Sequence, residues 1–183
     1  MFIFIYNLIL EMLKVFFGIE LFFNKYLIKN KTRFTFQALF LKFYKIDFGR
    51  NIYFNKVPFI LKPENIFLGD NCSFGENTKF YNHTTIRIGD NFLGAPGISF
   101  LTGGHNPETL EGITKPIVIG KGCWCAYNVT ILPGVTIGDN VSIGSCSVVT
   151  KDIESNSIAV GSPARVVRKF KLKNRYTKNI LRD

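Results

Sequence analysis

The stretch Ile119–Glu154 decides how this chain folds, and in blocks of six it reads IGKGCW, CAYNVT, ILPGVT, IGDNVS, IGSCSV and VTKDIE. An apolar residue opens each block, a small residue usually follows, and a small or β-branched residue comes fifth. Such a fixed short period is typical of a parallel β-helix, in which each repeat buries its apolar face only against its neighbours. A three-sided coil takes three blocks, so this stretch predicts about two turns rather than a few alternating strands of a β-sandwich.

Interrupted copies of the same period precede this stretch. Blocks of six open at Phe48 and Leu68, and Ile88 restarts the pattern two residues out of phase. A small bulge is therefore expected a few residues before Ile88. We predict one all-β domain over residues 47–164, a parallel β-helix of about five coils.

The repeat breaks at residues 102–116, which read TGGHNPETLEGITKP. Glycine, proline and polar residues cannot fill the inward positions of the repeat, so this segment is expected to leave the coil as a loop. A long excursion from a rigid scaffold is a common place for function, because the scaffold holds it while leaving it accessible.

The two ends of the chain are basic and its body is nearly neutral. The net charge is +10, and residues 165–183 carry 8 Lys and Arg against 1 acid, whereas residues 51–164 carry 7 against 9. Charge alone does not choose between anionic lipid, nucleic acid and a phosphorylated cofactor. No recognised nucleic-acid motif accompanies the charge, so nucleic acid ranks last. Residues 165–183 are predicted to form a short basic cap, helical or extended, over the open end of the coil.

Residues 1–46 form an apolar, aromatic-rich segment that we predict to be helical. Within residues 1–28 the polar positions would line one narrow stripe of a helix, at Asn7, Glu11, Lys14, Gly18 and Lys25. No signal peptide is evident, and the longest charge-free run is too short to span a bilayer. Two interpretations stay open: an in-plane membrane anchor, or a helix packed on its own domain and its oligomeric partners. The wide apolar face and the flanking basic residues favour membrane contact.

The four cysteines form no CxxC pair and no metal-ligand grouping with the two histidines. Three of them lie in or beside small or apolar positions of the repeat. They are predicted to be reduced packing residues of a cytosolic protein, and no metal is expected.

Several motifs occur together in a combination that resembles one family. They are the blocks of six, Gly104-His105-Asn106 in the excursion, the Trp124 block, the run Asn128–Asn140, the ending Val149–Ile153, and Gly161–Arg165. Over about residues 48–170 the chain resembles the hexapeptide-repeat acetyltransferases. Within them it is similar to the galactoside and maltose acetyltransferases and to the O-acetyltransferases of bacterial surface polysaccharides. The amino-terminal segment lies outside this resemblance.

The resemblance implies a left-handed β-helix, a handedness that the period does not reveal. It also implies a homotrimer with three active sites, each in a cleft between neighbouring subunits, where acetyl-CoA lies along the coils as the acyl donor. A zinc carbonic anhydrase class shares this fold but needs three histidines, and this chain has only His83 and His105.

His105 suits the role of general base, because an imidazole can accept the proton of a sugar hydroxyl and release it again. Its position on the excursion matches the catalytic histidine of the family; a loop histidine without a special role is the alternative. The acceptor contacts are predicted at Asn82, His83, Asn106 and Trp124. For Asn82 and His83 the alternative is a solvated turn, and for Trp124 it is a trimer contact.

The resemblance assigns the acetyl-CoA groove to Ala126, Tyr127, Ser145, Thr150, Lys151, Arg165 and Arg168. A backbone N–H near Ala126 or Tyr127 would stabilise the thioester carbonyl as it gains negative charge. Arg165 and Arg168 match basic residues near the 3′-phosphate, which Arg can hold with two parallel bonds. The chain has Cys125-Ala126 after the tryptophan where the family usually has Ile-Gly, which affects the detailed fit of pantetheine.

We therefore expect an acetyl-CoA-dependent O-acetyltransferase that modifies a sugar hydroxyl of a bacterial surface polysaccharide or its lipid-linked precursor. N-acetylation of an amino sugar is one alternative, since the same base would serve it. A non-catalytic trimeric scaffold at the membrane is another. The expected location is the cytoplasm, at the inner face of the inner membrane if residues 1–28 bind lipid.

Overall fold

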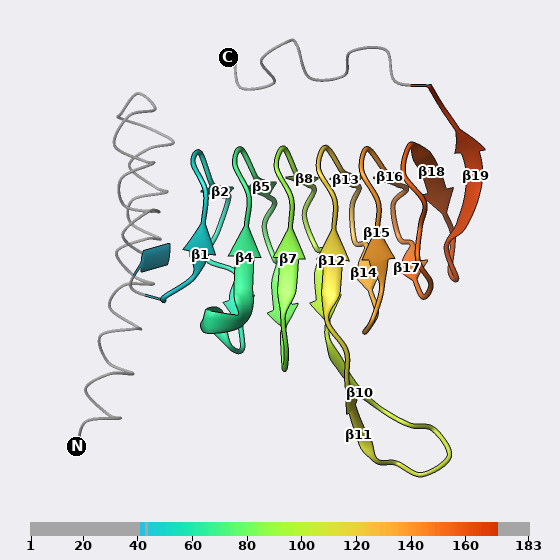
Figure 1. Cartoon of the computed structure of the whole chain (residues 1–183), viewed down its shortest axis with the longest axis horizontal. Helices are drawn as coiled ribbons and strands as arrows, with labels where there is room; N and C mark the ends of the chain where they lie inside the picture. The colour runs from blue at the N-terminus through green and yellow to red at the C-terminus, as the bar shows by residue number, and fades with distance from the viewer. Residues whose placement is uncertain (1–40, 43, 172–183) are drawn as a thin grey trace.

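The computed structural model describes residues 41–42 and 44–171. The predictions for residues 1–40 and 172–183 lie outside these described residues. Three stacks of short parallel strands form the sides of a β-solenoid, and the chain passes through sheets A, B and C in turn on each coil (Figure 1). We name the turns by the sheets they join, so that a B–C corner follows sheet B and a C–A corner follows sheet C.

Sheet A contains β1 (Asp47–Phe48), β4 (Ile66–Leu68), β7 (Ile86–Ile88), β12 (Ile117–Ile119) and β15 (Thr136–Ile137). Sheet B contains β2 (Tyr53–Phe54), β5 (Ser73–Phe74), β8 (Leu93–Gly94), β13 (Trp124–Cys125), β16 (Ser142–Ile143), β18 (Ser157–Val160) and β19 (Arg165–Lys169). Sheet C contains β3 (Phe59–Ile60), β6 (Lys79–Tyr81), β9 (Ser99–Leu101), β14 (Thr130–Ile131) and β17 (Val148–Val149). A 3₁₀ turn, η1 (Pro63–Asn65), fills the first C–A corner.

The blocks of six are confirmed as the unit of the solenoid. Their first and fifth residues point inward and are buried: Ile119, Cys125, Ile131, Ile137, Ile143 and Val149 open the blocks, and Cys123, Val129, Val135, Val141, Ser147 and Ile153 come fifth. The first residue ends one strand and the fifth ends one corner, so each side of the prism sends two side chains into the core. Between coils, the core is continuous because each inward residue stacks on its counterpart in the next coil.

The solenoid has about six turns, not the predicted five. Sheet A contains five strands, and a bridge from Ile137 to Ile153 adds a sixth level. This last coil is short, since Ile137 and Ile153 are 16 residues apart whereas Ile119 and Ile137 are 18 apart. A coil of 16 residues does not keep the six-residue period. The repeat pattern in the sequence therefore did not reveal the last coil. The left-handed winding remains a prediction of the resemblance.

The predicted shift in phase before Ile88 is confirmed at the second C–A corner. Phe80 and Arg87 are seven residues apart, but their counterparts in a later coil, Ile131 and Thr136, are five apart. The two additional residues belong to the corner that contains His83. This corner is therefore wider than the regular ones.

Asparagines hold the A–B corners together. Asn51, Asn71, Asn91, Asn140 and Asn156 all adopt the left-handed conformation, with φ between 57° and 59°. Asparagine tolerates this conformation better than most residues because its short amide bonds locally. Here the amides also bond from coil to coil, for example from Asn51 Nδ2 to Asn71 Oδ1 at 2.8 Å.

The excursion is an antiparallel hairpin rather than an irregular loop. β10 (Gly103–His105) pairs with β11 (Gly112–Thr114), and the pair projects from the solenoid below β12 (Figure 1). At the far end of the coil, β19 pairs antiparallel with β18, so the described part of the predicted cap takes the extended form. The hairpin and β19 are the departures from the parallel stack, and both carry predicted site residues.

A helix end meets the first coil at residues 41–46. Lys45 has a φ of 56°, and the Ile46 N–H donates to the Leu41 carbonyl at 3.0 Å, which closes the helix with a left-handed residue. Leu41 and Ile46 are buried in the core, so this end is fixed to the solenoid. Within residues 41–42 and 44–171, no helix has the length and apolar character needed to cross a membrane.

Candidate functional site

The base of the hairpin is tied to the wide C–A corner of the preceding coil. Thr102 is fully buried, and its hydroxyl oxygen accepts the Thr84 N–H at 3.0 Å. On the other strand, the Lys115 N–H donates to the Thr102 carbonyl at 2.9 Å. From this fixed base the hairpin carries His105 outward, where its side chain is exposed.

The tip of the hairpin is organised by Asn106. Its side-chain oxygen accepts the Glu108 N–H at 2.9 Å, and its carbonyl accepts the Leu110 N–H at 2.8 Å. These bonds form a compact turn directly after His105. Asn106 therefore shapes the hairpin, and a contact with the acceptor stays a prediction.

Asn82 has a structural role. It is fully buried, and its side-chain oxygen accepts the N–H groups of Leu61 and Lys62 at 3.2 Å and 3.1 Å. Its Nδ2 donates to the Lys62 carbonyl. The amide thus caps the first C–A corner, and it does not point at solvent as a sugar ligand would. The next residue, His83, is exposed and lies against the backbone of Gly103.

Two exposed turns at neighbouring B–C corners present free backbone donors. The Ala126 N–H donates to the Ile143 carbonyl at 2.9 Å and the Cys146 N–H to the Tyr127 carbonyl at 2.8 Å. Tyr127 directly follows Ala126, and Ser145 directly precedes Cys146. The N–H groups of Tyr127 and Ser145 have no acceptor within the described part of the chain. Both residues are exposed, so each offers a fixed N–H dipole to a ligand that lies along these corners. We call the two corners that carry the N–H groups of Tyr127 and Ser145 the donor corner.

The cationic residues near the end of the solenoid lie on β19 and the last C–A corner. Arg165 and Arg168 are exposed on β19, and Thr150 and Lys151 are exposed at that corner. Lys169 instead pairs with Glu154, which keeps the pKa of that carboxyl below its usual value.

Comparison with known proteins places the chain among its relatives. Residues 116–151 match the family model described as bacterial transferase hexapeptide (six repeats). The chain is 38% identical over 127 residues to the galactoside O-acetyltransferase of Escherichia coli K12, covering 67% of this chain and 63% of that enzyme. It is 32% identical over 134 residues to the putative colanic acid biosynthesis acetyltransferase WcaF of E. coli K12, covering 72% of this chain and 74% of WcaF. The chain belongs to the hexapeptide-repeat acetyltransferases.

Solved structures of this acetyltransferase family have the same fold. A maltose O-acetyltransferase from Clostridium difficile 630 aligns with a TM-score of 0.73 at 30% identity, over 88% of this chain and 84% of that one. A galactoside acetyltransferase in complex with coenzyme A aligns with a TM-score of 0.65 at 29% identity, over 95% of this chain and 88% of that one.

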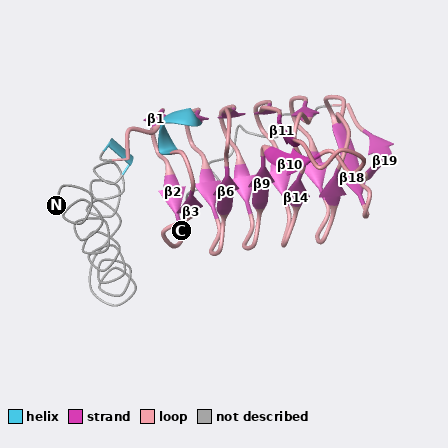
Figure 2. Ribbon diagram, turned by 90° about the horizontal axis from the view of Figure 1, so that it is seen from below, coloured by secondary structure: helices cyan, strands magenta, loops and turns pink. Residues whose placement is uncertain are grey.

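In this hexapeptide-repeat acetyltransferase, one chain does not bring all the predicted site residues together. His83 and His105 lie at the C–A corners, whereas Ala126, Tyr127 and Ser145 lie at the B–C corners. Sheet C separates the two edges of the prism (Figure 2). Trp124 points outward from sheet B, where 43% of its surface is exposed. Within one chain, His105 and the N–H groups of Tyr127 and Ser145 therefore lie at different edges of the prism.

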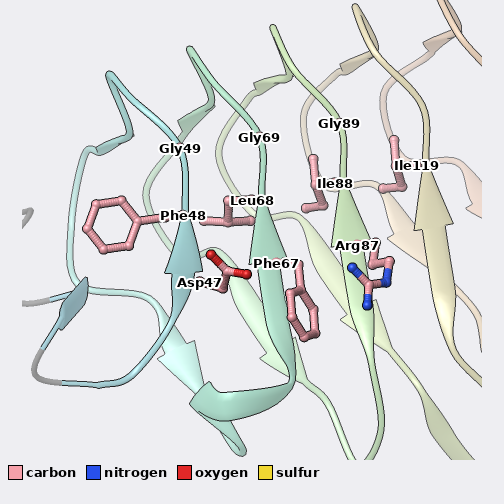
Figure 3. Close-up of a pocket in the computed structure, with 10 residues that line it drawn as sticks. All are labelled: Asp47, Phe48, Gly49, Phe67, Leu68, Gly69, Arg87, Ile88, Gly89 and Ile119. Carbon is pink, nitrogen blue, oxygen red and sulfur yellow. The ribbon is translucent and has the colours of Figure 1, made fainter.

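An open groove crosses the outer face of sheet A on the first coils (Figure 3). It is lined by Asp47, Phe48, Gly49, Phe67, Leu68, Gly69, Arg87, Ile88, Gly89 and Ile119. The Arg87 guanidinium lies 4.0 Å from the centre of the Phe67 ring. None of the predicted site residues lines this groove, so it is separate from the hairpin and from the donor corner.

All four cysteines are free thiols in the structure. Cys72, Cys123 and Cys125 are buried, and burial raises the pKa of Cys72 to about 11. Cys146 is exposed beside Ser145. In the part of the chain that the structure describes, no group of three His, Cys, Asp or Glu side chains could hold a metal ion.

Sequence reasoning missed the residues that hold the hairpin. Thr84, Thr102 and Gly103 have no motif that signals their role. Thr84 bonds to Thr102, 18 residues away, and Gly103 lies against His83 of the preceding coil. The only sequence signal was the double glycine before His105, which indicated a break in the coil and not a specific contact.

Proposed function

We propose that this protein transfers the acetyl group of acetyl-CoA to a hydroxyl of a sugar, in a bacterial surface polysaccharide or its lipid-linked precursor. The observation that carries the proposal is an exposed histidine, His105, on a hairpin that is anchored to the solenoid by the hydrogen bond from Thr84 to the buried Thr102. Anchoring the hairpin in this way supports catalysis, because it keeps the imidazole of His105 within reach of the acceptor hydroxyl.

The reaction needs one proton relay. The imidazole of His105 takes the proton of the sugar hydroxyl as that oxygen attacks the thioester carbonyl. The tetrahedral intermediate then collapses, its C–S bond breaks, and the imidazolium returns the proton to the departing coenzyme A thiolate, which regenerates the neutral base. The products are the sugar acetyl ester and free coenzyme A, and no other reactant is required.

The donor corner offers the second half of the site. The free N–H of Tyr127 or Ser145 can donate to the thioester carbonyl or to a pantetheine amide. Ala126, which is buried with 5% of its surface exposed, lies at this corner beside Tyr127. Thr150, Lys151, Arg165 and Arg168 lie farther toward the end of the solenoid, where basic side chains suit the phosphates of coenzyme A.

The acceptor is proposed from the relatives and from residues near the hairpin. Relatives are named for galactosides, maltose and colanic acid, and each of these is a carbohydrate. Asn106 follows His105 directly, His83 lies against Gly103 at the start of the same hairpin, and Trp124 would contribute an aromatic face.

A homotrimer would join the two edges of the site, because the donor corner of one subunit would face the hairpin of the next. Light scattering of the full chain should give the mass of three subunits, and a mass of one chain would contradict the trimer.

We also propose that residues 1–28 bring the protein to the cytoplasmic face of the inner membrane. Removing residues 1–28 should shift the protein from the membrane fraction to the supernatant. An unchanged distribution between these fractions would contradict the membrane proposal.

A direct assay tests the proposed reaction. The purified full chain is incubated with acetyl-CoA and with matched sugars that differ in one position, hydroxyl against amino, and thiol release is followed. We expect release that depends on the hydroxyl acceptor and a product that loses its acetyl group in mild alkali, as an ester does. An alkali-stable amide formed only with the amino sugar would favour N-acetylation, and failure of calorimetry to detect coenzyme A binding would favour the scaffold.

A further inference from the structure

The imidazole of His83 lies directly on the first residue of the hairpin. A methyl group added at Gly103 would lie 3.0 Å from Cγ and 3.2 Å from Nε2 of His83, and closer still to Cδ2. The contact with Cδ2 is shorter than real Cβ contacts become, and the other two are tighter than most of them, so the ring occupies the space that a side chain at this position would need. At Gly104 and Gly112, in contrast, an added methyl group would meet nothing within 4 Å.

The contact belongs to a two-point attachment. Thr84, next to His83, donates its N–H to the hydroxyl of Thr102, next to Gly103. The corner and the hairpin are thus joined at two consecutive residues, one through a hydrogen bond and one through ring packing. The two extra residues of this corner give the chain room to place an imidazole there.

The pairing of the hairpin relates this contact to His105. Gly103 pairs with Thr114 and His105 with Gly112, so both lie in one regular strand, two residues apart. Side chains two residues apart in a strand leave from the same face. The face of β10 that rests on His83 is therefore the face from which the His105 side chain projects.

We propose that His83 is a positioning residue that supports the hairpin and thereby fixes His105, and that Gly103 must be glycine because the ring occupies its side-chain position. The consequence for acetyl transfer rests on the proposed function, whereas the support of the hairpin does not. Without the ring, the strand would keep the Thr84–Thr102 bond but would lose packing under its first residue. The hairpin could then rotate about its base, and His105 would leave the acceptor.

A double-mutant cycle on the full chain tests this contact. The variants are His83→Ala, Gly103→Ala and the double variant, with Gly104→Ala as the matched control. Hydrogen exchange over residues 103–114 reports the support of the hairpin, and kcat and KM report the placement of His105. We expect His83→Ala and Gly103→Ala each to speed exchange several-fold and to lower kcat by about 10-fold to 100-fold, with KM for acetyl-CoA unchanged.

The double variant decides between support and independent damage. If the ring and the glycine contact each other as described, Gly103→Ala adds little once the ring is gone, so the effects are not additive. His83→Phe, which keeps a planar ring, should restore most of the exchange protection, and Gly104→Ala should leave it unchanged. Additive effects, or unchanged exchange in His83→Ala, would overturn the proposal.

The two readouts separate this inference from the proposed reaction. A non-additive cycle in hydrogen exchange together with no acetyl transfer to any sugar would leave the support of the hairpin intact and reject the proposed function. Acetyl transfer together with additive effects in the cycle would support the proposed function and reject the support of the hairpin by His83. A change of KM for acetyl-CoA alone would also reject the positioning role, because His83 lies away from the donor corner.

Discussion

Replacing His105 with alanine should lower acetyl transfer to the sugar hydroxyl by about 10²-fold to 10⁴-fold, the range that a general base contributes. The side chain is exposed and packs into no core, so its removal should leave the fold intact. Binding of coenzyme A should also persist, since the donor corner lies at the B–C corners and β19 lies in sheet B, away from the C–A corner that carries the hairpin. The measurement is kcat/KM for the acceptor, with calorimetry of coenzyme A binding beside it.

The matched control for this variant is Glu108→Ala. Glu108 is also exposed and also on the hairpin, but its carboxylate is three residues beyond the imidazole and at the tip. Its variant should keep kcat/KM within about threefold, the scale of a surface substitution. Retention of full activity in His105→Ala would reject the base, and loss of coenzyme A binding in that variant would mean that His105 is part of the donor site instead.

The regular part of the fold was predictable because the positions that pack into the core recur at a fixed spacing in the sequence. Ile131 and Ile137 recur six residues apart since each ends one strand and points into the same core. The final coil was not predictable in this way. Ile153 reaches its counterpart Ile137 after 16 residues, and the pairing of β16 with β18 continues the same coil.

The candidate site was predictable in kind but not in arrangement. His105 could be found because the residues around it cannot fill the repeat. The task of Asn82 could not be found, because its bonds to Lys62 cross from one coil to another and leave no local pattern.

Replacing Phe80 with alanine should destabilise the solenoid by about 3–5 kcal/mol, the usual cost of removing a buried phenylalanine ring. Phe80 is fully buried, and its ring stacks on that of Phe100, with 4.9 Å between centres and 12° between planes. It also meets Phe74 edge-on at 5.7 Å. The cavity would lie between these rings, and a solenoid cannot collapse around it easily because each coil is held in register by the coils on both sides.

Phe59→Ala is the matched control, because it removes the same ring from the neighbouring strand of sheet C. Phe59 points outward with 47% of its surface exposed, and its ring rests on Tyr81 at 4.8 Å. Its variant should lose at most about 1 kcal/mol. The free energy of unfolding should be measured by urea denaturation at one fixed protein concentration, since assembly makes apparent stability depend on concentration. A loss in Phe80→Ala no larger than that in Phe59→Ala would mean that the coils do relax around the cavity, and that the phenylalanine stack is not what holds the second and third coils together.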